Sequence, residues 1–130
     1  MTFHLRVARG TNDLESVIRF YRDGLGLEVI GQFEGHAGFD GVMLCKRELP
    51  WHLEFTKELG VTAPPAPSKE NLLVIYLPER DEWQAAVDRM IRAGYAPISS
   101  HNPYWDVQGK TFEDPDGYRV VLQQAAWSPG

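Results

Sequence analysis

The amino-acid sequence predicts one α+β domain built from two similar halves, each made of a strand, a helix and three further strands. Helical periodicity occurs in two segments, residues 13–23 and 81–93, and short strand-like apolar runs flank both of them. The two halves repeat at an offset of about seventy residues. Self-similarity at a fixed offset indicates duplicated structural units, so the repeat supports the fold class more strongly than any single element does.

The first half begins with a predicted strand at residues 3–7 and a helix at 13–23. An apolar stripe at i, i+3, i+4 and i+7 spacing marks the helix, formed by Leu14, Val17, Ile18 and Tyr21. Asn12 is expected to cap the first turn, with Glu15 three residues on as in a capping box, and Gly24 to end the helix. The strands that follow are predicted at residues 27–33, 39–45 and 51–56.

The second half repeats this order, with a strand at residues 72–77 and a helix at 81–93 that ends at Gly94. The apolar stripe of this helix is formed by Trp83, Val87, Met90 and Ile91. Its later strands are predicted at residues 96–99, 110–113 and 118–123. A proline-rich connector at residues 59–69 is expected to join a module at 1–58 to a module at 70–126, within a single domain spanning residues 1–130.

Each half should place its helix on one face of a small sheet and leave the other face bare. A helical crossover returns the chain to the same end of a sheet, so the strands before and after each helix should run parallel. Bare sheet faces must be covered by each other or by a partner chain. We therefore expect a cleft between the halves that binds a small molecule.

Strand alternation identifies the side chains of the first half that should face this cleft. The polar side chains on the bare faces of the first and fourth strands are Thr2, His4, Arg6, His52, Glu54 and Thr56. These side chains either form a solvated face or line the cleft, and the sequence leaves both interpretations open. If Glu54 is buried, it needs a partner, and Arg6 is the nearest counter-ion.

The second half contributes three aromatic candidates and one arginine. Tyr76 and Arg119 lie at bare-face positions of their strands. Tyr104 and Trp105 follow each other in a predicted loop at the mouth of the cleft. They could stack on a flat ligand or anchor the loop on the protein's own core, and both interpretations remain open.

The composition excludes some classes of partner. Asp and Glu number 18 against 13 Lys and Arg, which gives a formal net charge of −5 and argues against binding to nucleic acid or anionic membranes. Charges interrupt the apolar residues near the N-terminus, so neither a secretory leader nor a spanning segment is expected. Cys45 is the only cysteine and is expected to be a buried strand thiol. Together these features predict a soluble cytoplasmic protein.

Three groups of residues, in this order and spacing, resemble the vicinal oxygen chelate superfamily, which includes glyoxalase I, extradiol dioxygenases, and fosfomycin- and bleomycin-resistance proteins. They are Ser-Val-Ile-Arg-Phe-Tyr-Arg-Asp-Gly-Leu-Gly-Leu at 16–27, His-Leu-Glu-Phe at 52–55, and Asn-Pro-Tyr-Trp at 102–105 with Thr-Phe-Glu-Asp-Pro-Asp-Gly-Tyr-Arg-Val at 111–120. The resemblance covers nearly the whole chain. It implies two βαβββ modules that form a cupped, eight-stranded mixed sheet, and it implies a homodimer.

The resemblance also implies where a metal would bind in metal-dependent members. Glu54 matches a ligand carboxylate, whereas the other three ligand positions fall on Thr2, Leu72 and Val121. If Thr2 is level with Glu54, His4 and His52 lie about 13 Å apart along the strands, at about 3.3 Å per residue. One ion cannot bind both histidines at that separation, so we expect no metal cofactor unless a partner chain supplies a ligand.

Two functions follow from the resemblance and remain open. The first is metal-free binding or sequestration of a small amphipathic, aromatic compound, as in bleomycin-resistance proteins. Glu54 with Arg6 or His4 would fix the polar end of that compound, and Tyr104 and Trp105 would stack on it. The alternative is a metal-dependent lyase, isomerase or dioxygenase that uses Glu54 and His52 on a metal or as a general base.

Overall fold

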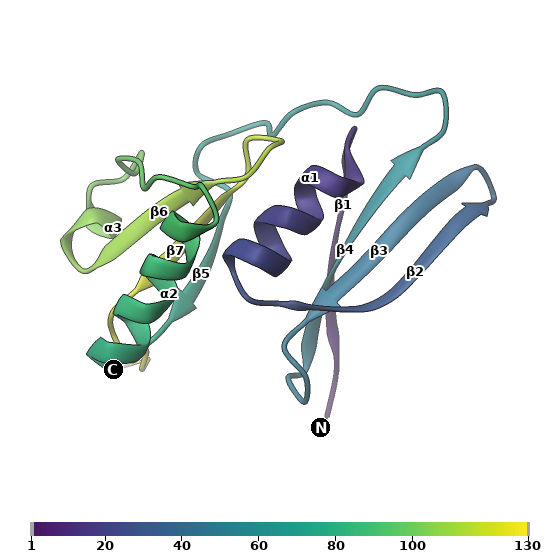
Figure 1. The fold of residues 1–130 in the computed structure, drawn as a ribbon. Coiled ribbons are helices and arrows are strands. Elements are labelled where there is room, and N and C mark those ends of the chain that lie inside the picture. The colour runs from purple at the N-terminus through teal and green to yellow at the C-terminus, as the bar shows by residue number, and fades with distance from the viewer. Residues whose placement is uncertain (1, 130) are drawn as a thin grey trace. The chain divides into compact units, whose positions relative to one another are not determined.

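The computed structural model describes residues 2–129, and the chain divides into two compact units, one ending at Pro64 and one beginning at Pro65. In each unit a helix lies against a β-sheet (Figure 1). The predicted α+β class and the duplicated strand–helix–strand order are confirmed.

The first unit contains a four-stranded sheet. Its strands are β1 (Leu5–Gly10), β2 (Glu28–His36), β3 (Phe39–Cys45) and β4 (Trp51–Glu58). They are arranged in the order β1-β4-β3-β2, with β1 parallel to β4 and the other neighbours antiparallel. The parallel pair follows from the helical crossover after β1, and the antiparallel pairs follow from the short connections between later strands. The first strand was predicted at 3–7, so it begins two residues later and extends three residues further than expected.

The helical segment of this unit has two parts, α1 (Leu14–Ile18) and the wider-wound η1 (Arg19–Gly24). The prediction that Asn12 caps it is wrong. Asp13 is the cap, and its carboxylate accepts hydrogen bonds from the backbone N–H and the hydroxyl of Ser16, at 3.2 and 2.6 Å. Asn12 is unavailable for capping because its side-chain amide binds the backbone of Ala63.

The core of the first unit lies between this helical segment and one face of the sheet. Tyr21 and Phe55 stack with their ring centroids 4.8 Å apart, and both side chains are buried. The remaining buried apolar side chains on the two elements and β3 include Val17, Phe20, Val42, Leu44 and Leu53. The opposite face of the sheet, which we call the open face, carries the alternate residues of each strand.

The second unit contains a three-stranded sheet and two helices. Its elements are β5 (Leu72–Tyr76), α2 (Arg80–Arg92), α3 (Tyr104–Val107), β6 (Gly109–Glu113) and β7 (Arg119–Gln123). The strand order is β5-β7-β6, with β5 parallel to β7 and β6 antiparallel to it. α2 is attached through Trp83, whose indole N–H donates to the carbonyl of Leu122 at 2.8 Å.

Two predictions for this unit are wrong. The strand expected at 96–99 is a single bridge between Ile98 and Thr111, because Pro97 lacks the N–H that a longer ladder needs. The described residues therefore form seven strands in sheets of four and three, rather than eight. Ile91, expected in the apolar stripe of α2, is 49% exposed, whereas Val87 and Met90 are buried.

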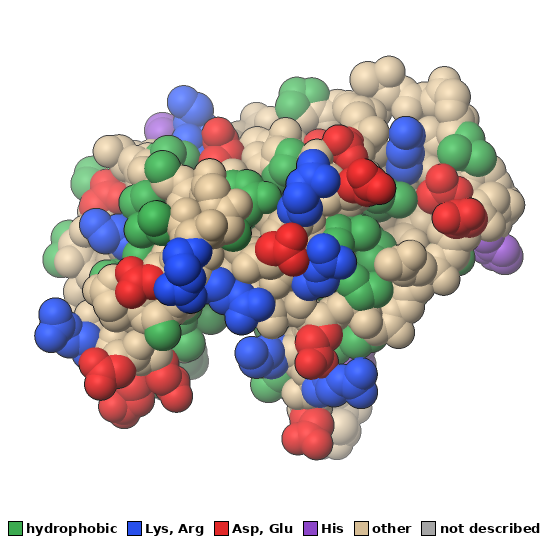
Figure 2. Space-filling view, viewed as in Figure 1, with side chains coloured by type: hydrophobic (Ala, Val, Ile, Leu, Met, Phe, Trp, Pro, Cys, Tyr) green, Lys and Arg blue, Asp and Glu red, His purple; other side chains and the backbone are tan. Residues whose placement is uncertain are grey.

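Acidic and basic side chains are interspersed over the face of the molecule shown in Figure 2. In the described part of the chain, no helix is long and apolar enough to cross a membrane. Cys45 is buried at the end of β3, as expected.

Candidate functional site

The structure brings four of the predicted polar residues together on the open face of the first sheet. Arg6 of β1 pairs in register with His52 of β4. The Nε of Arg6 donates to Nε2 of His52 at 2.8 Å, and its terminal nitrogen lies 3.4 Å from the carboxylate of Glu54. His4 completes the group, with its Nε2 at 2.5 Å from Nδ1 of His52. We call these four residues the polar cluster.

The contacts within the polar cluster fix the protonation of both imidazoles. Arginine can only donate, so Nε2 of His52 must be the unprotonated, accepting nitrogen. A neutral His52 then carries its proton on Nδ1 and donates it to Nε2 of His4. His4 consequently keeps its own proton on Nδ1, which lies outside this chain of hydrogen bonds.

The electrostatic environment keeps His52 neutral. Burial of the ring lowers the pKa of His52, and the adjacent Arg6 charge and His4 lower it further, whereas Glu54 raises it. His52 as a whole residue is only 9% exposed, while half of the Arg6 side chain and 14% of the Glu54 side chain reach solvent. The polar cluster therefore combines one cation and one carboxylate with two neutral imidazoles.

The position expected for a metal must be corrected. Ala8, and not Thr2, is level with Glu54, because β1 is shifted along β4 relative to the predicted register. This shift also brings His4 and His52 into direct contact, so the expected separation of about 13 Å is wrong. In the second sheet Leu72 pairs with Arg119, and Val121 pairs with Val74. Within residues 2–129, no three His, Cys, Asp or Glu side chains are grouped as metal ligands would be.

Beyond the polar cluster, the open face becomes apolar. Met43 of β3 pairs with Glu54, and its sulfur lies 3.9 Å from the Arg6 guanidinium. Gly31 and Gly41 leave room on the same face: a methyl group on Gly31 would approach the end of Met43 to 2.8 Å, and one on Gly41 would overlap the ring of Phe33. The ends of two large apolar side chains thus lie over glycines, where they form the floor of the open face.

A small pocket lies at the far end of this floor. Its volume is about 200 Å³, and it is lined by Gly10, Phe39, Thr56, Glu58 and residues 61–64. Thr56 was predicted as a ligand-binding residue, and it pairs in register with Gly10. The segment 61–64 is held in place by Asn12, whose amide nitrogen donates to the carbonyl of Ala63 at 3.0 Å and whose oxygen accepts from its N–H at 2.7 Å.

The second unit positions the remaining predicted residues. Tyr76 and Arg119 share one face of their sheet, as expected from alternation. Tyr76 is partly exposed, whereas Arg119 is buried and its Nε lies 3.4 Å from the Glu113 carboxylate. Tyr104 and Trp105 lie on the short helix α3, with their rings in a T-shaped contact at 4.9 Å. The ligand-binding roles of these residues remain predictions.

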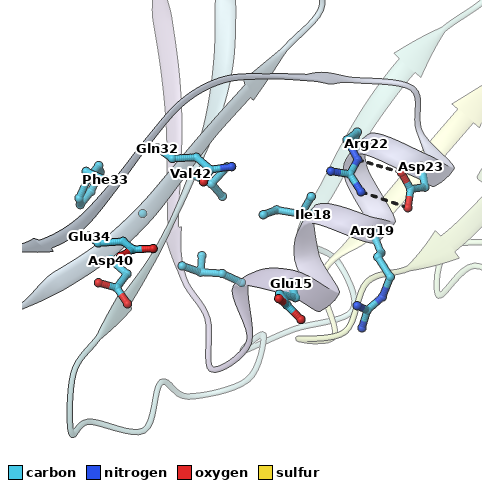
Figure 3. Close-up of a pocket in the computed structure, with 12 residues that line it drawn as sticks. Glu15, Ile18, Arg19, Arg22, Asp23, Gln32, Phe33, Glu34, Asp40 and Val42 are labelled. Atoms are coloured by element: carbon cyan, nitrogen blue, oxygen red, sulfur yellow. Dashed lines mark hydrogen bonds and ion pairs between the residues drawn. The ribbon is translucent and has the colours of Figure 1, made fainter.

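Another groove, of about 520 Å³, lies on the helix-covered side of the first sheet (Figure 3). Ile18 of α1 points towards Val42 of β3 across its apolar part, and the rim is charged (Figure 3). On that rim Arg22 and Asp23 pair at 2.9 Å. No local pattern predicts this groove, since it depends on how far the helical segment covers β2 and β3.

Several residues of the open face were missed in the sequence. Met43 could have been found, because strand alternation places it on the same face as Glu54 once β3 and β4 are known to pair. Phe39 could have been found in the same way, because alternation along β3 places it on the same face as Met43. By contrast, no local pattern predicts that residues 61–64 close one end of the face, since that depends on the side chain of Asn12.

Models of two protein families match the chain. The YycE-like N-terminal domain matches residues 5–56, and the YycE-like C-terminal domain matches residues 70–124. The chain is 43% identical over 121 residues to the YycE protein of Bacillus subtilis (strain 168), with 93% of this chain and 87% of that protein covered.

Solved structures agree with these matches. A crystal structure of a YycE protein from Bacillus subtilis superposes with a TM-score of 0.89 at 43% identity, covering 98% of this chain and 93% of that one. Glyoxalase I of Leishmania major shares the fold with a TM-score of 0.71 at 21% identity, covering 96% and 88% of the two chains. An antibiotic binding protein from Streptomyces sp. CB03234 shares it with a TM-score of 0.66 at 18% identity, covering 97% and 98%. The chain therefore belongs to the YycE-like family, within the vicinal oxygen chelate superfamily.

Proposed function

We propose that this protein binds a small amphipathic, aromatic compound without a metal, on the open face of the first sheet. One observation carries the proposal: a polar cluster and a small pocket occupy opposite ends of the same face. Between them lies a floor of apolar side chains and glycines. A ligand with a polar end and an aromatic body matches this order of surfaces.

The spacing of the two ends sets the length of the ligand. Arg6 pairs with His52 at one end, and Gly10 pairs with Thr56 at the other, four residues along the same parallel strands. Four residues of strand span about 13 Å, which is close to the length of two fused aromatic rings with a polar substituent. Met43 and Phe33 would contact the faces of such rings.

The chemistry of the polar end follows from the hydrogen bonds already made within the polar cluster. The guanidinium of Arg6 has further N–H groups, and Nδ1 of His4 carries a proton. Glu54 uses one oxygen towards Arg6, so its other oxygen can accept a hydrogen bond. With one cation and one carboxylate, the cluster suits a neutral or zwitterionic group that both donates and accepts.

The same contacts support metal-free binding. The Arg6 guanidinium lies between His52 and Glu54, where a divalent ion would have to bind in order to reach both. A fixed positive charge at that point opposes cation binding. The nitrogen of His52 that faces away from Arg6 is engaged by His4. The residues present therefore do not fit a metal, and Glu54 alone is a poor metal site.

The relatives add coarser support. An antibiotic binding protein from Streptomyces sp. CB03234 shares the fold, and its binding of a small compound is consistent with the proposal. A homodimer in the cytoplasm, as expected from the resemblance and the composition, is part of the same proposal.

A fluorescence titration with dansylamide, a naphthalene whose neutral sulfonamide group both donates and accepts hydrogen bonds, tests the proposal. We expect saturable binding that weakens about three- to tenfold in Arg6→Gln, the loss appropriate to a charged hydrogen bond at a half-exposed side chain. Thr56→Trp, which fills the pocket, should weaken it as well. Arg22→Gln is the matched control, because Arg22 is half-exposed like Arg6 and pairs with Asp23 at 2.9 Å on the helical segment, which covers the opposite face of the sheet.

Elemental analysis of protein purified without added metal completes the test. The proposal expects no transition metal at stoichiometric level. A stoichiometric metal that is lost in Glu54→Gln would support the metal-dependent lyase or dioxygenase instead. Equal dye affinity in wild type, Arg6→Gln and Thr56→Trp would remove the open face as the binding surface.

A further inference from the structure

The groove beside α1 lies on the helix-covered side of the first sheet, away from the polar cluster (Figure 3). Glu54 pairs with Met43 and shares its side of the sheet, whereas Val42, the neighbour of Met43 in β3, lines the groove. The groove volume of about 520 Å³ falls within the range of about 300–1,000 Å³ that is usual for small-molecule sites. The groove is therefore a second surface of this unit, distinct from the open face.

An apolar strip forms the middle of the groove. Leu14 and Ile18 lie four residues apart on α1, so they share one face of the helix. Both keep part of their surface exposed, whereas Val17 and Tyr21, on the neighbouring face, are fully buried. Across the groove, Ile18 points towards Val42 (Figure 3). The helical segment thus carries more apolar surface than the sheet covers.

The charged side chains on the helix side of the groove have opposite charges close by. Arg22 and Asp23 pair at 2.9 Å. Glu15 and Arg19 lie four residues apart, the spacing at which opposite charges on a helix attract each other. Arg19 also donates to Oγ of Ser16 at 3.1 Å. The two positive and two negative charges of the lining on this side therefore offset each other.

The strand side of the groove is acidic. Glu34 of β2 and Asp40 of β3 lie close together there, because the backbone N–H of Gly35 donates to the Asp40 carboxylate at 2.8 Å (Figure 3). Among the described lining residues, β2 and β3 contribute these two carboxylates and no base. Lys57 of β4 pairs in register with Asp40 but does not line the groove. The net charge of the lining is thus negative and concentrated at one side of the apolar strip.

From this arrangement we infer that the groove binds a small organic cation, namely a primary amine carried on a flat apolar body. The ammonium group binds the carboxylates of Glu34 and Asp40, and the apolar body packs between Ile18 and Val42. Asp40 accepts through the oxygen that Gly35 does not use. Charge complementarity selects this occupant, because an anion would meet two carboxylates and an uncharged molecule would gain nothing from them.

Tryptamine is the probe for the test, since it carries an ammonium group on an indole. Tryptophol is the matched compound, with the same ring and chain and a hydroxyl in place of the ammonium group. Binding is followed by NMR through the methyl groups of Leu14, Ile18 and Val42, and the methyl group of Met43 reports on the open face. We expect tryptamine to bind at the groove about three- to tenfold more tightly than tryptophol, as for two exposed ion pairs, and this advantage should shrink at high salt.

Glu34→Gln provides the decisive variant, because the side chain is exposed and only its charge is removed. Tryptamine affinity should fall about two- to fivefold, while tryptophol affinity stays the same. Asp40→Asn should behave in the same way, since it keeps the oxygen that accepts from Gly35. Glu48→Gln is the matched control: it removes the same charge from an exposed position beyond the other end of β3 and should leave both affinities unchanged.

The inference is overturned if millimolar tryptamine leaves the groove methyl groups unshifted, or if tryptophol binds there equally well. It is also overturned if Glu34→Gln and Glu48→Gln weaken tryptamine binding to the same extent. Dansylamide binding, measured in the same variants, keeps the two surfaces apart. Glu34→Gln should leave dansylamide affinity unchanged, and the effect of Arg6→Gln on dansylamide bears on the open face alone.

Discussion

The packing of Phe33 over Gly41 gives the sharpest prediction for the open face. A methyl group on Gly41 would overlap the end of the Phe33 ring, so Gly41→Ala must push the ring away from the sheet. Full burial of a phenylalanine contributes about 1.5–3 kcal/mol, and Phe33 is half-buried, so displacement should cost about 1–1.5 kcal/mol. Alanine recovers about 0.5–1 kcal/mol through the smaller backbone entropy of the unfolded chain.

A double-mutant cycle isolates this effect. We expect Gly41→Ala to lower the free energy of unfolding by about 0.5 kcal/mol in the wild-type background and to raise it by about 0.5–1 kcal/mol when Phe33 is already alanine. The coupling between the two sites is therefore about 1–1.5 kcal/mol. Urea unfolding, read from NMR signals of β3 and β4, reports the first unit separately from the second.

Gly10→Ala is the control for the cycle. A methyl group there would meet only Ala63 at 3.6 Å and a backbone oxygen at 3.9 Å, which are ordinary contacts. It should have the same effect with or without the Phe33 ring. Equal costs of Gly41→Ala in both backgrounds would show that the ring does not lie over Gly41, and the apolar floor would have to be reconsidered.

Three further outcomes are expected. Phe55→Ala should lower the free energy of unfolding of the first unit by about 3–5 kcal/mol in urea titrations, because the side chain is buried against Tyr21; a loss below 1 kcal/mol would contradict the assigned core. The imidazole pKa of His52, followed by NMR, should rise in Arg6→Gln and fall in Glu54→Gln, and shifts of the same sign in both variants would refute the assigned contacts. The pKa of His52 is lower in the folded than in the unfolded state, so the unfolded state takes up the imidazole proton first as the pH falls. The free energy of unfolding should therefore decline below about pH 6.5, and His52→Gln should remove that decline from the pH profile.

Local patterns in the sequence decided much of the fold. The spacing of Val17 and Tyr21 identified one face of the first helical segment, and both residues are buried there. Alternation placed Arg6, His52 and Glu54 on one side of their strands, and the structure puts them together. Such assignments succeed because helix and strand periodicities are properties of consecutive residues.

Other features were decided only by contacts between distant residues. Alternation has a period of two, so it assigns a face to each residue of β1 but says nothing about how far β1 is shifted along β4. That shift brings His4 against His52 and leaves Ala8, rather than Thr2, level with Glu54. The N-cap differs from the prediction for the same reason. Asn12 binds Ala63, about fifty residues away in the sequence, and Asp13 caps the helix instead.

Local sequence patterns were thus enough to predict the fold class, the duplicated modules and the faces on which polar residues lie. Tertiary packing set the register of the paired strands, the contact between His4 and His52 and the pairing of Asn12 with Ala63. Side chains alternate between the two faces of any strand, so alternation assigns a face but not a register. Register and hydrogen-bond partners depend on the packing and pairing energy of segments that lie far apart in the chain.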